Sequence, residues 1–176
     1  MNKSFNVKTL TLGGAIAALY VVLTWVSKLL GLDSGAIQLR LSEALTILPV
    51  FTSAAVPGLT LGCLLANLTV GCVPGDIALG TLATLLGAIG TRLLRKRVEI
   101  AWLPPVISNM LIVPLVIIFF YFSPDVSIEI PFLNINLCAS GYVPIMITVG
   151  IGEALACGWL GLLLHKALKN VPDLAD

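Results

Sequence analysis

The stretch from Ala44 to Gly75 constrains the fold more than any other part of the chain, because its 32 residues carry no charged side chain. A single helix of that length would extend about 48 Å at roughly 1.5 Å per residue, whereas the hydrocarbon core of a bilayer is about 30 Å thick. Pro57-Gly58 stands near the middle, and both residues disfavour a continuous helix. We therefore expect two membrane spans here, residues 41–56 and 58–71.

The remainder of the chain has the same apolar character. Hydrophobic residues make up 58% of the chain and charged residues 11%, against about 25% charged residues in soluble domains, and the mean hydropathy is +1.04. These values predict an integral, multi-pass membrane protein whose residues 1–176 form one domain. With roughly 20 residues per span, we expect an all-α bundle of six transmembrane helices. The other four spans are residues 9–30, 74–94, 102–122 and 141–168.

The basic residues indicate how these spans cross the membrane, because cytoplasmic loops are enriched in Lys and Arg. With the N-terminus inside, six spans place the basic cluster at 92–97 inside, together with Lys166 and Lys169. Five spans would place that cluster outside, so six are favoured and both termini are predicted to be cytoplasmic. The loop 123–140 then lies outside. Alternation of apolar and polar residues across 128–136 predicts a short extended segment or a cap over the mouth of the bundle.

Glu153 lies in an otherwise uncharged stretch, residues 141–164, about 11 residues or roughly 16 Å from Tyr142 at the outer interface. A carboxylate near the bilayer midplane costs several kcal/mol unless it faces the bundle interior or a watery cavity, so Glu153 is a candidate binding residue. The alternative is a protonated carboxylic acid that bonds to a neighbouring helix.

Two more acids are expected at outer helix ends. Arg40 and Glu43 are three residues apart, on one face at the start of the second span, and the apolar run after Glu43 draws it towards the bundle interior. A surface ion pair at the outer interface is the alternative. Asp76 follows Pro74-Gly75 at the outer end of the fourth span, where a helix N-cap is the alternative to a place in the same mouth.

Two amide side chains, Asn67 in the third span and Asn109 in the fifth, also lie at bilayer depth. Each is a candidate ligand contact or an interhelical hydrogen bond. Asn109 falls in the cytoplasmic half of its span, which makes it the weaker contact for a substrate that enters from outside.

One pocket in the outer half of the bundle can combine five of these residues. They are Glu43, Glu153, Asp76, Asn67 and Arg40. Such a pocket is rich in hydrogen-bond acceptors and carries net negative charge. It suits a small polar ligand with several N–H donors, because a carboxylate accepts two adjacent N–H groups bidentately.

Other classes of function lack support in the sequence. No nucleophile has a base within reach, because the only histidine, His165, is at the cytoplasmic end, and no Gly-rich phosphate loop occurs, so we expect no enzyme. The four cysteines form no Cys-x-x-Cys pair. They are expected to pack as small buried apolar residues, without a metal or cofactor. The net charge of +1 predicts no nucleic-acid partner.

The first span contains two pairs of small residues at a spacing of four, Gly13/Ala17 and Gly14/Ala18. Such pairs let another helix approach closely. They either pack within the bundle or dock the chain onto a separate membrane subunit.

Several segments, which together extend over nearly the whole chain, resemble the QueT family. The most specific is the element Arg40-x-Ser42-Glu43 within residues 37–45. The others are Leu48-Pro49-Val50-Phe51, Pro57-Gly58-Leu59, Gly62-Cys63-Leu64-Leu65-Ala66-Asn67, Gly80-Thr81-Leu82-Ala83-Thr84 and Gly152-Glu153-Ala154.

QueT proteins are substrate-binding S-components of energy-coupling factor (ECF) transporters, assigned to uptake of queuosine precursors across the bacterial plasma membrane. The resemblance implies a six-helix membrane protein with a pocket open to the outside. It also implies a transmembrane T-component and two cytoplasmic ATPases as partners, whose ATP hydrolysis topples the S-component and releases the ligand inside. S-components dock through an Ala-x-x-x-Ala pair on the first helix, for which this chain has Gly14 and Ala18.

The ligand that this resemblance implies is a 7-deazaguanine, either the 7-aminomethyl compound or queuine. Glu43 or Glu153 would accept hydrogen bonds from the ring N1–H and the 2-amino group. Asp76 would pair with the exocyclic ammonium.

Further implied contacts come from Asn67, to the ligand carbonyl or pyrrole N–H, and from Tyr142 or Phe132, stacked on the ring. Three alternatives to this function remain. The chain could bind another small vitamin-like ligand as an S-component, act on lipid as a small intramembrane enzyme, or serve a structural role in which Glu153 and Asn67 bond helices together.

Overall fold

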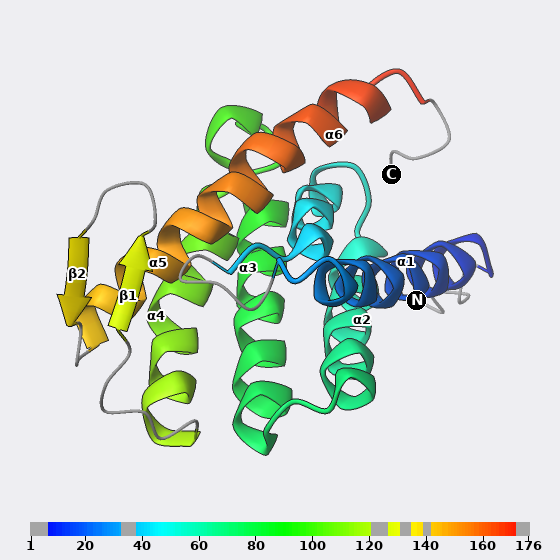
Figure 1. Cartoon of the computed structure of the whole chain (residues 1–176). Coiled ribbons are helices and arrows are strands. Elements are labelled where there is room, and N and C mark those ends of the chain that lie inside the picture. The colour runs from blue at the N-terminus through cyan, green and yellow to red at the C-terminus, as the bar shows by residue number, and fades with distance from the viewer. Residues whose placement is uncertain (1–6, 33–37, 121–126, 131–134, 139–141, 172–176) are drawn as a thin grey trace.

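The computed structural model describes residues 7–32, 38–120, 127–130, 135–138 and 142–171. The regular elements among these residues are helices, apart from one short hairpin (Figure 1). In chain order the elements are α1 (Val7–Leu29), η1 (Leu41–Val50), α2 (Ala55–Val70), η2 (Asp76–Gly80), α3 (Thr81–Leu93), η3 (Val98–Ile100), α4 (Leu103–Phe120), β1 (Ser127–Ile130), β2 (Ile135–Cys138), α5 (Tyr142–Glu153), η4 (Ala154–Leu160) and α6 (Gly161–Leu168). Two of the short segments, η1 and η3, are 3-10 helices, whereas η2 and η4 are π-helical.

Four of these helical stretches are long and apolar enough to cross a membrane: Val7–Leu29, Asp76–Leu93, Val98–Phe120 and Tyr142–Leu168. The second and third apolar segments, Leu41–Val50 and Ala55–Val70, are shorter. At about 2.0 Å per residue the ten-residue 3-10 helix extends only about 20 Å. The order of six apolar segments is therefore the one that the sequence predicts, with four long enough to span a bilayer by themselves.

The boundary between the second and third segments differs from the prediction. The chain leaves η1 at Val50 and begins α2 at Ala55, so the break comes before Pro57-Gly58 rather than at it. Pro57 lies in the first turn of α2, where a backbone N–H would have no partner within the helix and proline is tolerated. The proline therefore starts a helix here instead of interrupting one.

The short helix η1 occupies the centre of the bundle. It contacts α1, α2, α3, η4 and α6, and every residue from 42 to 49 is buried. Around it, α1 packs along α2, while α2, α3 and α4 stand side by side and the continuous α5–η4–α6 helix crosses them obliquely (Figure 1). The segment that is too short to span a membrane is thus enclosed by longer helices.

Two glycines of α2 allow α1 to approach closely. A Cβ added at Gly58 would lie 2.7 Å from the carbonyl oxygen of Gly13, and one added at Gly62 would lie 3.0 Å from Ala17 Cα. A Cβ at Gly14 would meet nothing within 4 Å, and Gly14 and Ala18 are both exposed. The two small-residue pairs of α1 therefore separate: Gly13/Ala17 packs within the bundle, and Gly14/Ala18 lies on the outer surface.

The distribution of polarity is that of a membrane protein. Large apolar side chains such as Leu61, Leu86 and Phe119 are exposed, while polar side chains such as Thr46, Thr84 and Asn109 are buried. Soluble domains place their polar groups in water, so an apolar exterior around buried polar groups indicates contact with lipid.

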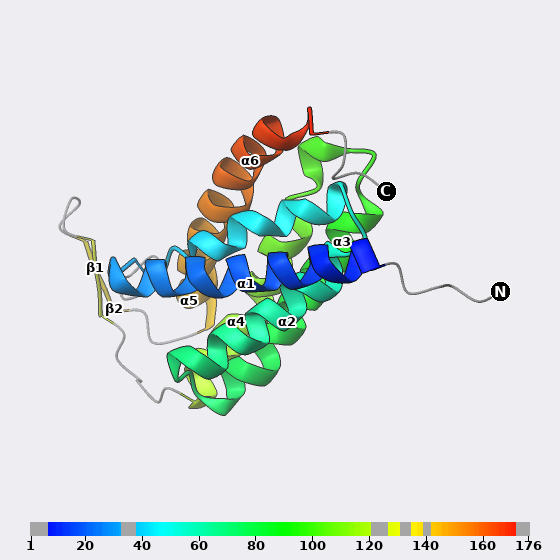
Figure 2. The ribbon, with the colours of Figure 1, turned by 90° about the vertical axis from the view of Figure 1, so that its right-hand side faces the viewer.

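The hairpin agrees with the extended segment predicted at 128–136. Strands β1 and β2 pair antiparallel, with Ser127 opposite Cys138 and Ile130 opposite Ile135. In Figure 2 the hairpin lies at one end of the molecule and the start of α1 at the other. Residues 131–134 of the predicted segment lie outside the described residues.

Candidate ligand-binding site

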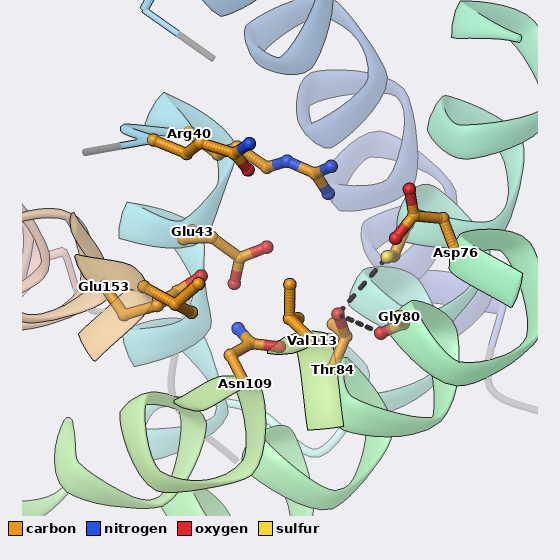
Figure 3. Close-up of a pocket in the computed structure, with 11 residues that line it drawn as sticks. Arg40, Glu43, Asp76, Gly80, Thr84, Asn109, Val113 and Glu153 are labelled. Atoms are coloured by element: carbon orange, nitrogen blue, oxygen red, sulfur yellow. Dashed lines mark hydrogen bonds between the residues drawn. The ribbon is translucent and has the colours of Figure 1, made fainter. Parts of the chain in front are cut away.

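A partly enclosed cavity lies where η1, α2, α3, α4 and α5 meet (Figure 3). Its volume is about 30 Å³, room for one or two water molecules and well below the roughly 300–1,000 Å³ of small-molecule sites. A small-molecule ligand therefore requires the lining side chains to move apart. Gln38 is exposed and marks the mouth. The lining residues are Gln38, Arg40, Glu43, Cys63, Asp76, Gly80, Thr84, Asn109, Val113, Val149 and Glu153.

Glu43, on η1, projects into this cavity. Its side chain is only 2% exposed, which excludes the alternative of a surface ion pair with Arg40. The hydroxyl of Tyr20 donates a hydrogen bond to Glu43 Oε1. Glu43 Oε2 is buried and has no hydrogen-bond partner among the described residues. A buried polar atom without a partner costs about 1–3 kcal/mol, so Oε2 is an acceptor in need of a donor.

Glu153 provides a second carboxyl group beside Glu43. Cys157, one helical turn further along the chain, donates from Sγ to Glu153 Oε2 at 3.3 Å. The same sulfur accepts from Thr46 Oγ1 at 3.3 Å. Because two neighbouring carboxylates repel each other, an N–H donor or a cation between them is stabilised.

One atom from each of Glu43, Glu153 and Cys157 could bind a metal ion, and these three atoms lie within 4.8 Å of one another. Carboxylate and thiolate groups are zinc ligands, although structural zinc sites have four protein ligands. The sequence predicts no metal site, and the structure groups three side chains that could hold one.

Arg40 and Asp76 lie across the cavity from Glu153. The guanidinium of Arg40 lies between Glu43 and Asp76 in Figure 3 and interacts electrostatically with both carboxyl groups. Asp76 is 7% exposed and occupies the first turn of η2, where the helix dipole favours an acid. These two residues make the opposite wall of the cavity charged.

Asn109 and Thr84 form much of the remaining polar surface. Asn109 is 4% exposed, and its amide nitrogen points towards Glu43 (Figure 3). Asn109, which its expected depth made the weaker candidate, therefore lines the cavity. Thr84 Oγ1 lies within hydrogen-bond distance of two groups, the carbonyl oxygen of Gly80 at 3.1 Å and Cys63 Sγ at 3.2 Å.

Cys63 and Cys157 are buried, as predicted, and each also contacts a polar side chain. Cys63 lines the cavity and contacts Thr84 Oγ1, while Cys157 bonds to Glu153. Thiols are weak donors and acceptors, so these contacts are available when hydroxyl and carboxyl groups are their neighbours.

Both π-helical segments adjoin the cavity. η2 begins with Asp76 and ends with Gly80, which both line it, and η4 begins directly after Glu153. π-helical turns are rare and frequently occur at functional sites.

Two candidate residues lie apart from the cavity. Asn67 is buried, and its Nδ2 donates to the backbone carbonyl of Asp76 at 3.0 Å. Tyr142 donates from its hydroxyl to the carbonyl of Leu111 at 2.7 Å. Neither side chain lines the cavity, and Phe132, the other candidate for stacking on a ligand, lies outside the described residues.

Comparison with known proteins places the chain in a family. The model of the family described as the QueT transporter matches residues 10–170, a range that contains every residue that lines the cavity. The chain belongs to the QueT transporter family. No solved structure matches it.

A curated QueT protein is similar over part of its length. The protein named queuosine precursor transporter QueT from Lactococcus lactis subsp. cremoris (strain MG1363) is 34% identical over 85 residues. The match covers 48% of this chain and 47% of that protein, so the chain spans about half the length of the relative it matches.

Membership of the QueT family confirms several sequence predictions. The family is one of transporters rather than enzymes, which leaves the intramembrane lipid enzyme without support. With four membrane-length helices, the chain is a multi-pass protein of the plasma membrane.

Several residues of this cavity carry no signal in the sequence. Gln38, Thr84, Val113 and Val149 line the cavity, but neutral residues of these types are ordinary in and beside membrane helices and give no signal. Tyr20, which contacts Glu43, does carry a signal in the sequence. Tyr20, Thr24 and Ser27 are hydroxyl residues spaced so that they lie on one face of α1.

Proposed function

We propose that the chain is the membrane-embedded, substrate-binding S-component of an ECF-type importer and that it takes up a 7-deazaguanine precursor of queuosine. Membership of the QueT family and the name of the Lactococcus relative support this proposal. The observation that carries it is the unpartnered Glu43 Oε2, which lies in a cavity beside a second carboxyl group, that of Glu153.

The donors of 7-aminomethyl-7-deazaguanine complement the charges of this cavity. The ring N1–H and 2-amino group form a donor edge that a carboxylate accepts bidentately. We assign this edge to the Glu43 and Glu153 side of the cavity, where Oε2 lacks a donor. The ammonium group on the opposite side of the ligand would then reach Asp76, and Asn109 would bond the ring from the cavity floor.

The basic residues support an orientation for the six helical segments. The link between α3 and α4 carries Arg95, Lys96 and Arg97, and the end of α6 carries Lys166 and Lys169. In Figure 2 both regions lie towards the upper right, away from the hairpin. We take this end as cytoplasmic, which places both termini inside and the hairpin outside.

The partners proposed for this chain are a transmembrane T-component and two cytoplasmic ATPases. The support is the surface pair Gly14/Ala18, at which a partner helix could approach the α1 backbone. ATP hydrolysis in the partner complex would drive release of the ligand on the cytoplasmic side.

Calorimetric titration of the detergent-purified protein with 7-aminomethyl-7-deazaguanine tests the ligand. Glu43→Gln and Glu153→Gln each replace one carboxyl oxygen by an amide nitrogen. A hydrogen bond to an ionised carboxylate is worth about 1.5–3 kcal/mol, or roughly a ten- to hundredfold change in Kd. Glu99→Gln is the matched control, because Glu99 is exposed and lies in η3, apart from the cavity. EDTA in the buffer prevents a metal from occupying the carboxylate pair.

Unchanged affinity in both cavity variants would refute the proposed site. Thermal-shift measurements with queuine, riboflavin, biotin and thiamine separate ligand classes. We expect a rise in melting temperature with deazaguanines alone, and a larger rise with any of the three vitamins would refute the proposed substrate.

A further inference from the structure

Three hydroxyl side chains follow one face of α1. Tyr20, Thr24 and Ser27 are separated by four and three residues, the spacing that aligns side chains on a helix. All three are buried, although α1 is otherwise an apolar membrane helix. Buried hydroxyl groups need hydrogen-bond partners. Thr24 and Ser27 each contact the backbone carbonyl four residues earlier in α1 at 2.9 Å, and all three hydroxyls also have a partner in a different element.

The hydroxyls bond to three consecutive residues at the start of η1. Ser27 Oγ accepts the backbone N–H of Leu41 at 2.8 Å. Thr24 Oγ1 donates to Ser42 Oγ at 2.9 Å. The Tyr20 hydroxyl donates to Glu43 Oε1. The contacts therefore advance one residue at a time along η1 while they retreat along α1, which fixes the register between the two elements.

This arrangement also fixes the direction of the Glu43 carboxyl group. A glutamate side chain has three rotatable bonds, and ordering it on ligand binding costs about 1–2 kcal/mol. The Tyr20 hydroxyl occupies one carboxyl oxygen, so the other, Oε2, is left as the acceptor in the cavity. A binding group that is already ordered loses less entropy when the ligand arrives.

We propose that Tyr20 is a positioning residue that sets the specificity of the site, because it holds Glu43 with one carboxyl oxygen aimed at the donor edge of the ligand. This inference rests on the proposed function, since it assumes that Glu43 receives that edge. Tyr20 itself does not line the cavity. It acts through Glu43, from the helix that also carries the exposed Gly14/Ala18 surface.

A double-mutant cycle tests the proposal. The variants are Tyr20→Phe, Glu43→Gln and the double variant, and the probes are 7-aminomethyl-7-deazaguanine and its analogue without the 2-amino group. Phenylalanine keeps the ring, which packs in the main apolar cluster, and removes only the hydroxyl. We expect Tyr20→Phe to weaken binding of the first probe about tenfold and to weaken it less than twofold when Glu43 is already Gln. In Tyr20→Phe, the ratio of the Kd for the analogue to the Kd for the first probe should fall by a similar factor.

Thr91→Val is the matched control. It also removes one buried hydroxyl, which donates to the carbonyl of Ala101 at 2.9 Å, yet Thr91 does not line the cavity. We expect it to lower thermal stability without changing either Kd. An equal loss of affinity from Tyr20→Phe in both Glu43 backgrounds would mean a purely structural role and would overturn the proposal.

A second variant covers the case in which Tyr20→Phe does not fold. Glu43→Asp keeps the charge but withdraws the carboxyl group by one methylene from Tyr20, so we expect at least a tenfold weaker Kd, and wild-type affinity would overturn the proposal. A different result would refute the proposed function itself, namely that the wild-type protein binds no deazaguanine. If Glu43→Gln weakens binding and Tyr20→Phe does not, only the role of Tyr20 is rejected.

Discussion

Asn67 and Asn109 show why a polar residue type at bilayer depth does not by itself reveal its role. Both are buried amides. Asn67 bonds to the backbone of Asp76 and so holds the start of η2 against α2, whereas Asn109 faces the carboxyl groups of the cavity. The difference depends on which neighbour each side chain meets, and that is a property of packing between helices.

Loss of the Asn67 side chain should therefore destabilise the fold. Asn67→Ala leaves the carbonyl of Asp76 without this donor, for which we expect a loss of about 1–3 kcal/mol. Asn170→Ala, at an exposed amide beyond α6, should leave stability unchanged. Thermal unfolding of the two variants in detergent measures the difference, and equal melting temperatures would show that the Asn67 contact contributes nothing.

The charged part of the site could be predicted from sequence, and the neutral part could not. Arg40, Glu43, Asp76 and Glu153 attract attention because a charge near an apolar run is energetically costly, and all four line the cavity. Val113 and Val149 also line it, but a valine in a membrane helix has no such cost. The hydroxyl contacts between α1 and η1 were likewise not predictable, because they depend on how the two elements pack together.

At the scale of elements, a shift of one residue along α1 separates an internal contact from an exposed surface. Successive residues of a helix point about 100° apart. Gly13 and Ala17 consequently face α2, and Gly14 and Ala18 face outwards. The sequence revealed both pairs but could not say which faced the bundle, because both have the same spacing. The six apolar segments were predictable from charge and length, whereas the 3-10 geometry of η1 was not.

Replacing a glycine inside the α1–α2 contact and replacing one outside it should have opposite effects on stability. In Gly58→Ala the new Cβ would lie 2.7 Å from the Gly13 carbonyl oxygen, and such overpacking costs about 1–3 kcal/mol. In Gly14→Ala the Cβ enters open space, and the higher helix propensity of alanine favours stability by up to about 1 kcal/mol. Circular dichroism melts of both proteins check this, and a neutral Gly58→Ala would show that α1 and α2 can move apart without cost.

The described part of the molecule presents an apolar exterior, polar groups inside and a strip on α1 that lacks bulky side chains. Leu19, Val22 and Trp25 are exposed further along the same helix, so the surface near Gly14 and Ala18 is shallower than its surroundings. A partner helix would gain close contact there and would not touch the cavity, because no residue of α1 lines it.

Enlarging this strip should therefore separate binding from transport. We expect Gly14→Leu with Ala18→Leu to keep the wild-type Kd for 7-aminomethyl-7-deazaguanine and to reduce uptake in cells that express the partner subunits by at least tenfold. Ala78→Leu, at an exposed alanine on η2, is the control and should leave uptake intact. Normal uptake by the α1 variant would exclude this strip as the docking surface.

The π-helical segment after Glu153 has a consequence for how this chain can change in length. A π-helical turn accommodates one residue more than an α-helical turn, so deletion of a single residue between 154 and 160 would let the helix relax to ordinary geometry and remain continuous. The two halves would then keep nearly the same rotation relative to each other, because the wider turn already absorbs the extra residue. Such a shortened chain would still form a membrane helix in which Glu153 faces Glu43.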